Sequence, residues 1–172
     1  MPIEPDTKNW TWVLDRQCPE CGFDAADVSL ADLPALLRDN IASWPAVLAR
    51  PDVAVRPDDS TWSPLEYSAH VRDVFRVFLG RLTLMLAEND PEFPNWDQDA
   101  AAVAARYAEQ DPKRVSVELV EAGTALADSF ERMPAEAASR TGRRSDGSRF
   151  TVESFGSYLL HDVVHHRWDV RG

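Results

Sequence analysis

The chain contains few residues of the kinds that most often bind metals or act as nucleophiles. Its 172 residues include only two Cys and four His. No apolar run approaches the length of about 18 residues that would predict a transmembrane helix. The N-terminal segment also lacks a basic start followed by an apolar run, so we expect no secretory signal and a cytoplasmic, thiol-reducing location.

Positive charge is scarce as well. Lys and Arg total 18 against 29 Asp and Glu, which gives a formal net charge of −11. Nucleic-acid phosphates and anionic membrane surfaces would be repelled by such a chain, so we expect neither as a partner. The length predicts one domain around a single core, and an apolar fraction of 44% is ordinary for a globular protein.

Apolar residues recurring at intervals of three and four predict helices along most of the chain. The first is expected over about 30–50, with a kink or break at Pro45. The second starts at Ser63-Pro64-Leu65-Glu66, which combines an N-cap Ser, Pro at the first helical position and Glu at the third, and runs to about Glu88. Further helices are expected over about 97–110, 112–132 and 151–170.

The remaining segments are short and irregular. Ser145-Asp146-Gly147 is typical of a hairpin turn, but no segment sustains strict alternation of apolar and polar residues. The sequence therefore predicts an all-α fold, most simply a four-helix bundle over residues 29–172. Residues 1–28 are expected to form an ordered arm packed by its aromatic side chains.

All four His lie on two of the predicted helices, with His70 on the second and the others on the last. His161 and His165 are four residues apart and project from one face, the usual spacing for two ligands of one metal ion. His70 would add a third ligand. Three neutral imidazoles suit Zn²⁺, Ni²⁺ or Fe²⁺ and leave a position open for water or substrate. The alternative is that these are ordinary core or surface residues.

The other residues near these rings include candidate hydrogen-bond acceptors. A metal-bound His normally donates its second ring N–H to such an acceptor. Helical spacing suggests Glu66 and Asp73 near His70, and Tyr158, Asp162 and Asp169 near the His pair. Each acid has the alternative of being a solvated surface residue, and Glu66 already has a capping role. His166 points about 100° away from His165 and is expected at the rim or surface.

Two further groups have an open interpretation. The loop over 134–150 is rich in Arg, and these side chains are candidates for binding an anionic substrate or simply solvent-exposed charges: Arg140, Arg143, Arg144 and Arg149. Cys18 and Cys21 resemble half of a zinc ribbon, but the chain has no second Cys pair. They are interpreted first as two reduced thiols, then as a redox-switchable dithiol, and last as a pair that approaches the His site or another subunit around a metal.

Two motifs resemble the DinB-like superfamily. One is the segment from Trp62 to His70, and the other is Phe150-Thr151-Val152 followed by His161 to His166. This superfamily includes YfiT-like metal proteins and the N-terminal domain of mycothiol-dependent maleylpyruvate isomerase. The resemblance covers roughly residues 29–170. It implies a four-helix bundle of up-down-down-up type, often dimeric, with a divalent metal held by three His, which here would be His70, His161 and His165.

The resemblance also implies a reaction. Family members with assigned activity use a low-molecular-weight thiol for S-transfer or isomerisation, so we expect a metal-dependent transfer of a mycothiol-like thiol to an electrophilic small molecule. Zn²⁺ is the expected metal, with Ni²⁺ or Fe²⁺ as alternatives. Because three neutral His would not reduce its 2+ charge, the ion would favour the thiolate form of a bound thiol. The alternatives are a non-catalytic metal-binding or small-ligand-binding stress protein and an isomerase. The absence of the extra C-terminal domain of the larger isomerases favours S-transfer.

Overall fold

A computed structural model describes residue 3 and residues 9–172 of the chain. Four long helices form the body of the molecule, which confirms the predicted helical bundle. They are α1 (Leu33–Leu48), α2 (Pro64–Ala87), α4 (Pro112–Arg132) and α5 (Val152–Asp169). A short helix α3 (Gln98–Ala104) lies in the connection between α2 and α4. None of the helices in the described part is both long and apolar enough to span a membrane.

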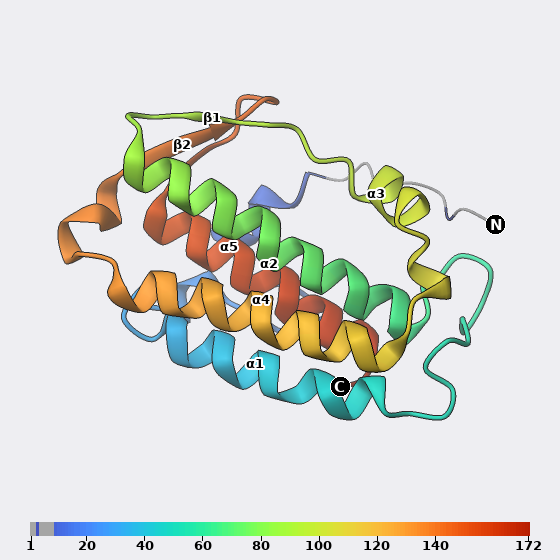
Figure 1. Ribbon diagram of the computed structural model, residues 1–172. Helices are drawn as coiled ribbons and strands as arrows, with labels where there is room; N and C mark the ends of the chain where they lie inside the picture. Colours follow the sequence, from blue (N-terminus) through green and yellow to red (C-terminus); the bar gives the residue numbers. More distant parts are fainter. Residues whose placement is uncertain (1–2, 4–8) are drawn as a thin grey trace.

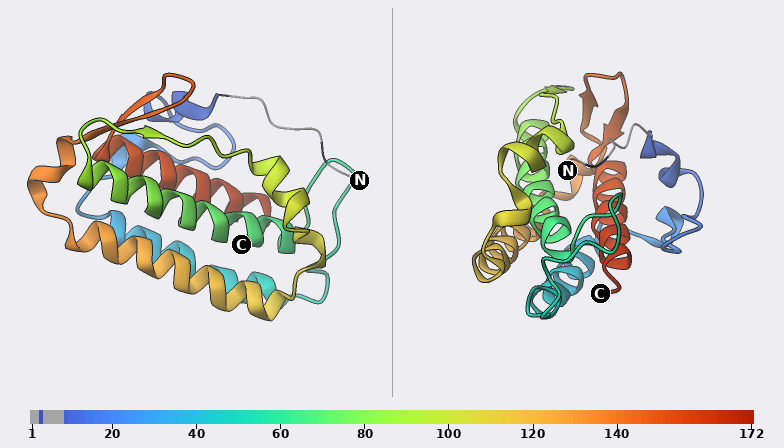
Figure 2. Two further views of the ribbon diagram at one scale, coloured as in Figure 1. Left: turned by 45° about the horizontal axis from the view of Figure 1, so that its top comes forward. Right: turned by 90° about the vertical axis from the view of Figure 1, so that its right-hand side faces the viewer.

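The four long helices run up, down, down and up. In Figure 1, α1 and α5 run in one direction, and α2 and α4 run in the other. Viewed from one end in Figure 2, α2 is followed around the bundle by α4, α1 and α5, so α2 and α5 are neighbours. The side chains at the centre of the bundle are almost wholly buried and include Leu37, Trp44, Phe75, Leu119, Leu126 and Leu159. This core fixes the relative positions of α2 and α5, the two helices that carry the His residues.

Local sequence signals set most of the helix ends. Ser63 and Glu66 form the predicted capping box of α2, in which each side chain accepts from the other residue's backbone N–H. A second capping box, between Thr151 and Ser154, starts α5. Of the kink or break predicted at Pro45, the break does not occur, because Pro45 lies inside one continuous helix. Burial of the neighbouring Trp44 against the other helices offsets the hydrogen bond that Pro45 cannot donate.

The helix predicted over 97–110 is shorter in the structure. Helix α3 ends at Ala104, and a 3₁₀ turn, η3 (Tyr107–Glu109), follows it. Between them Arg106 adopts a left-handed conformation with φ of 49°, which interrupts the helical hydrogen bonding. Asp111 then caps α4 by accepting from the backbone N–H of Lys113, so α4 is a separate helix and not a continuation.

A small three-stranded sheet closes one end of the bundle. Its strand order is β1 (Glu92–Phe93), β2 (Thr141–Arg144) and β3 (Arg149–Thr151). Strands β2 and β3 form an antiparallel hairpin in which Thr141 pairs with Thr151, and the predicted turn at 145–147 connects them. Strand β1, which the sequence did not predict, pairs in parallel with β2. The sheet therefore ties the chain after α2 to the chain before α5.

The N-terminal arm lies along α5, on the side away from α2 and α4 (Figure 2). It contains two 3₁₀ turns, η1 (Trp10–Leu14) and η2 (Ala25–Asp27), and buries Val13 and Cys18 almost completely. The predicted arm over 1–28 includes residues 1–2 and 4–8, which lie outside the described residues. The division of the chain at residue 28 stays a prediction.

Candidate metal centre

Helix α5 presents two pairs of possible metal ligands side by side. His161 and His165 form one pair at a spacing of four residues, and Asp162 and His166 form the next. Because successive residues of a helix point about 100° apart, the two pairs face different neighbours. Each pair joins other side chains in a cluster whose ligand atoms all lie within 4.8 Å of one another.

The first cluster, which we call the α2–α5 site, consists of His70, Asp162 and His166. Asp162 Oδ1 lies 3.9 Å from His70 Nε2 and 3.4 Å from His166 Nε2. The two imidazole rings are nearly perpendicular, at 85°, with centroids 4.8 Å apart. Two His and one carboxylate converging from two helices form a ligand set suited to Fe²⁺ and other divalent transition metals, with positions left for substrate.

Several polar atoms of the α2–α5 site are buried without a partner. Among the described residues, neither ring nitrogen of His70 has a hydrogen-bond partner, and Oδ1 of Asp162 has none either. Buried polar groups are rarely left in this state, because each costs stability that a bound ion would restore. Burial lowers the pKa of His70 well below its ordinary value, an effect that the neighbouring His166 strengthens, and burial raises the pKa of Asp162. The neutral imidazole is the form that binds a metal.

Neighbouring side chains hold these rings in place. His70 is enclosed by Trp62, with ring centroids 5.3 Å apart, and by Trp96, whose ring stacks on it at 5.6 Å. On α5, Asp169 Oδ2 lies 2.9 Å from His166 Nδ1. A carboxylate on Nδ1 favours the tautomer whose Nε2 lone pair faces Asp162 and His70. The site thus meets the requirements for a divalent metal in donor type, in unpartnered atoms and in ring orientation.

The second cluster, which we call the arm site, consists of Cys18, Cys21, His161 and His165. Both Cys are free thiols, and Cys18 Sγ lies 3.7 Å from His165 Nδ1. Burial lowers the pKa of His161 to about 4 and raises that of the Cys21 thiol to about 11. The Trp10 ring covers both imidazoles, with centroids 5.7 Å from His161 and 5.3 Å from His165.

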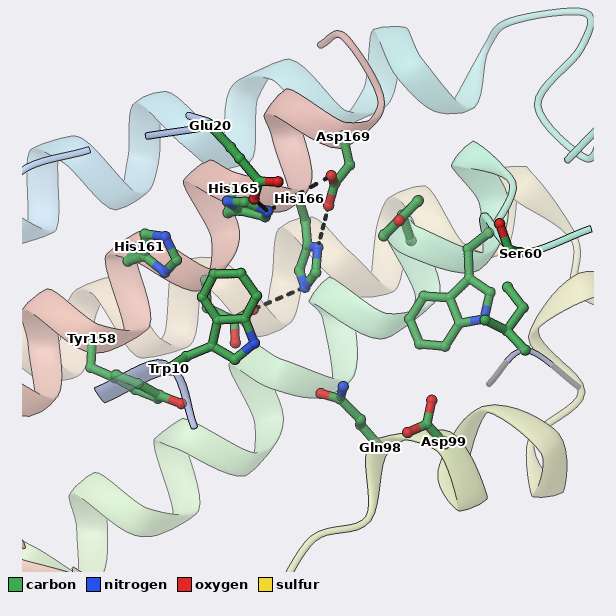
Figure 3. A pocket seen from close by; sticks show the side chains of 14 residues that line it. Trp10, Glu20, Ser60, Gln98, Asp99, Tyr158, His161, His165, His166 and Asp169 are labelled. Carbon is green, nitrogen blue, oxygen red and sulfur yellow. Dashed lines mark hydrogen bonds and ion pairs between the residues drawn. The ribbon is translucent and has the colours of Figure 1, made fainter. Parts of the chain in front are cut away.

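A cavity of about 360 Å³ opens beside both clusters (Figure 3). Its walls come from the N-terminal arm, α2, α3 and α5, and include Trp10, Glu20, Trp62, Tyr67, Gln98, Asp99, Tyr158, His161, Asp162, His165, His166 and Asp169. A second cavity of about 190 Å³ shares Gln98, Tyr158 and Asp162 with the first and adds Arg81 and Arg144. Asp162 of the α2–α5 site therefore borders both cavities.

The structure divides the three predicted His ligands between the two clusters. His70 belongs to the α2–α5 site, whereas His161 and His165 belong to the arm site. His166, expected at the rim or surface, instead shares a cluster with His70. The signal for this was present, because Asp162 and His166 have the same spacing as His161 and His165. The rotation of α5 against α2 decides which pair faces His70, and spacing alone does not give that rotation.

The predicted acceptors on α2 have other partners. Glu66 serves the capping box and accepts from Arg56 Nε at 2.8 Å. Asp73 accepts from the Tyr107 hydroxyl at 2.6 Å and forms an ion pair with Arg72 at 2.9 Å. The structure therefore gives neither carboxylate a hydrogen bond to His70, because each is directed toward a nearby Arg.

The predicted acceptors on α5 lie closer to the imidazoles. Asp169 contacts His166 as described, and its Oδ1 lies 3.9 Å from His165 Nε2. Asp162 is placed among the possible ligands. Tyr158 accepts from Arg144 Nη1 at 3.1 Å and lies in the wall between the two cavities. Glu20, which the sequence analysis did not select, lies 3.4 Å from His165 Nε2. It belongs to the N-terminal arm, so helical spacing does not relate it to His165.

The four Arg of the 134–150 segment have different roles in the structure. Arg140 donates to the carbonyl oxygens of Met85 and Glu88 at 2.6 and 2.7 Å, which fastens the segment to the end of α2. Arg143 and Arg149 form ion pairs with Asp90 at 3.2 and 2.8 Å. Only Arg144 lines one of the two cavities described above, where it is joined by Arg81 from α2, a residue that no sequence motif indicated.

Comparison with known proteins agrees with this architecture. The model of the DinB superfamily matches residues 35–170. No curated protein matches the chain. The structure of YfiT from Bacillus subtilis, described as a probable metal-dependent hydrolase with an unusual four-helix bundle topology, superimposes with a TM-score of 0.65 at 19% identity, over 83% of this chain and 80% of that chain. At this identity the likeness bears on the fold alone. Because the family model spans most of the chain, this protein belongs to the DinB superfamily.

Proposed function

We propose that the chain is a divalent-metal-dependent enzyme that transfers a low-molecular-weight thiol to a small electrophilic molecule. The observation that carries the proposal is the α2–α5 site. There His70 and Asp162 have buried donor atoms with no hydrogen-bond partner among the described residues, His166 lies within the same cluster, and Asp162 and His166 line a cavity. Three protein ligands leave at least one coordination position for a reactant, as in catalytic metal sites. In this proposal Asp162 and His166 take the places that the sequence analysis gave to His161 and His165.

The two adjoining cavities support a reaction between two substrates. The larger one has room for a small thiol and is bordered by Asp162 and His166, whereas the smaller one lies on the opposite side of Tyr158. A hydrolase needs one organic substrate and water, so a second cavity at the same site favours group transfer. The description of YfiT as a probable metal-dependent hydrolase makes hydrolysis the alternative to test.

The smaller cavity is suited to an anionic group of the substrate. Arg81 is half-buried over the rings of Phe78 and Phe93, at 5.6 and 5.4 Å, and forms no ion pair with any described carboxylate. Its polar contact is a 3.5 Å hydrogen bond to the carbonyl of Pro94. Burial and the nearby Arg144 lower the pKa of Arg81, and a bound anion would relieve both effects. We infer that the electrophile carries a carboxylate or a similar anion.

The chemistry follows from these positions. A divalent ion at the α2–α5 site would supply positive charge that favours the thiolate form of a coordinating thiol. The thiol would release its proton to water, its sulfur would form a bond to the electrophilic carbon, and the leaving group would depart with its electron pair. Asp169 keeps His166 oriented, Arg81 and Arg144 hold the anionic end of the electrophile, and Trp10 and Trp62 exclude water from the walls.

The test is a thiol panel with the metal-loaded protein. Mycothiol, bacillithiol and glutathione are each offered with activated halides, with and without a carboxylate, and loss of the electrophile is followed. We expect thiol-dependent turnover that falls at least about 100-fold in Asp162→Asn, because loss of a metal ligand should cost at least as much as the loss of about 10- to 100-fold that is typical for a residue orienting a ligand. Asp128→Asn makes the same change of charge on α4, in the Arg38 ion pair, and serves as the matched control.

Each outcome decides between the candidate functions. Turnover that requires thiol and Asp162 supports the proposal, and a lower KM for the carboxylate-bearing halide that is lost in Arg81→Met supports the anion site. Consumption of ester or amide substrates without thiol, also abolished by Asp162→Asn, would replace S-transfer by hydrolysis at the same site. Stoichiometric metal with no turnover over the panel would contradict the enzyme and favour a binding protein.

A further inference from the structure

We propose that Cys18, Cys21, His161 and His165 form a second metal site that holds a structural Zn²⁺ and fastens the N-terminal arm to α5. Each of these four residues offers one donor atom, and the four atoms all lie within 4.8 Å of one another. The ligands come from distant parts of the chain, since His165 follows Cys18 by 147 positions. The site takes no ligand from α2 and does not depend on the function proposed above.

The spacing of the donor atoms fits tetrahedral zinc. Zinc lies about 2.3 Å from a thiolate sulfur and about 2.0–2.1 Å from an imidazole nitrogen, so a tetrahedral angle places sulfur about 3.6 Å from nitrogen. Cys18 Sγ lies 3.7 Å from His165 Nδ1. This pair of ligands therefore needs almost no movement to bind an ion, and the remaining pairs are within reach of small side-chain rotations.

The turn that carries the two Cys is already shaped for this role. The backbone N–H of Cys18 donates to the carbonyl of Phe23 at 2.8 Å, and that of Gly22 donates back to the carbonyl of Cys18 at 3.0 Å. Gly22 has φ of 75°, a left-handed conformation that favours glycine. Gln17 closes the turn by donating its side-chain N–H to the carbonyl of Gly22 at 3.0 Å. The sulfurs are held on one side of a fixed loop.

The donor set selects the metal. Two thiols and two imidazoles with no carboxylate form a Cys₂His₂ set, which is typical of closed structural zinc sites and unsuited to Mg²⁺ or Ca²⁺. His165 binds through Nδ1, and its Nε2 lies 3.4 Å from Glu20, a carboxylate of the Cys turn itself. Such an outer carboxylate orients a ligating His. Nε2 of His161 is buried without a partner among the described residues.

The arm site also shapes the cavity of the proposed active centre. Trp10 covers His161 and His165 and, together with Glu20, forms one wall of the larger cavity. Figure 3 shows Trp10 and Glu20 beside the α5 imidazoles. Asp169 connects the two sites, because it contacts His166 at 2.9 Å and His165 at 3.9 Å. Loss of the arm-site zinc should therefore loosen this wall while the α2–α5 ligands remain.

The experiment measures metal content and Co²⁺ spectra of the full chain. Wild-type protein purified with reductant should hold zinc at the arm site, and Co²⁺ substitution should give the near-ultraviolet sulfur-to-metal charge-transfer band of thiolate ligation. The double variant Cys18→Ser, Cys21→Ser should lose one equivalent of zinc per chain and the whole band. Asp162→Asn should keep the thiolate band and the equivalent of zinc that the double Cys variant loses, because it alters only the α2–α5 site. Far-UV circular dichroism checks that the variants keep their helices.

Three outcomes would overturn the inference. One is an unchanged zinc content in the double Cys variant, and another is Co²⁺ bound without a thiolate band. The third is a Cys18–Cys21 disulfide in protein purified without reductant but with zinc present, detected by mass spectrometry after thiol labelling. If the Cys variant loses its helices, His161→Ala offers an independent check, since it should reduce zinc affinity and weaken the band while both thiols remain.

Discussion

Replacement of His70 by Leu should have opposite consequences for stability with and without metal. His70 is fully buried in α2, and neither ring nitrogen has a hydrogen-bond partner among the described residues. In metal-free protein, removal of these groups recovers about 1–3 kcal/mol for each unsatisfied nitrogen. Loss of the ring contacts with Trp62, Trp96 and His166 costs about 0.5–1.5 kcal/mol for each aromatic pair. The midpoints of these ranges are about 4 kcal/mol recovered and about 3 kcal/mol lost, so we expect His70→Leu to raise the metal-free unfolding free energy by about 1 kcal/mol.

With metal present, the same substitution should destabilise the protein. A ligand that binds only the folded state at 100 times its Kd adds about 2.7 kcal/mol to the free energy of unfolding. Wild-type protein should gain this amount from the α2–α5 site, whereas His70→Leu should gain little there. The effect of the substitution should therefore differ by about 2.7 kcal/mol between the two conditions. Any stabilisation from the arm site cancels, because both proteins keep its four ligands.

Urea unfolding followed by circular dichroism measures both values, first after dialysis against a chelator and then with added Zn²⁺ or Ni²⁺. Leu82→Ala, a buried substitution elsewhere on α2, serves as the control and should cost about 2–5 kcal/mol equally in both conditions. The reasoning is refuted if His70→Leu destabilises the chelated protein by several kcal/mol, or if its effect is the same with and without metal.

The remaining predictions concern four substitutions. Gly123→Ala in α4 should lower the free energy of unfolding by about 1–3 kcal/mol in urea titrations, because its Cβ would lie 2.7 Å from Ile41 Cδ1. Gly80→Ala, with no atom within 4 Å of its Cβ, should instead raise it by about 0.5–1 kcal/mol, and a loss at both positions would contradict the packing described. Ser63→Ala should cost about 0.5–2 kcal/mol by thermal or urea unfolding, since it removes the cap of α2, and no change would show that the capping box is dispensable. A side-chain hydrogen bond from Arg144 is the largest cause that lowers the pKa of Asp146 to about 2, and hydrogen bonds from Ser148 add to it, so an NMR titration of Arg144→Met should find this pKa raised toward 3.8. The associated stabilisation is present above pH 3.8 and is lost as pH falls through 2, and an unshifted pKa in the variant would assign the effect elsewhere.

The sequence predicts the helices well because their determinants are local. The capping box at Ser63 and the apolar intervals of α2, α4 and α5 act over a few residues and lead to elements whose bounds agree closely with the expected ones. The failures occur where another part of the chain decides. Pro45 stays helical because α1 is packed on its neighbours, and β1 forms only because the later hairpin offers an edge.

The candidate site was harder to predict for the same reason. Spacing along α5 supports two ligand pairs equally, His161 with His165 and Asp162 with His166. The packing of α5 on α2 determines that the second pair joins His70. The sequence indicated an arm packed by its aromatic side chains, but spacing could not show the contact of Cys18 with His165, which joins distant parts of the chain. Arg81 looks like any exposed helical Arg in the sequence, and the bend of the chain after α2 makes it part of a cavity.

The most direct test of the account is a crystal structure of the metal-loaded protein with anomalous scattering measured at the absorption edge of the bound metal. The account predicts one anomalous peak between His70, Asp162 and His166, separate from any peak at the arm site. A single ion held jointly by His70, His161 and His165 would contradict it, and so would the absence of any peak beside His70 in protein that contains stoichiometric metal.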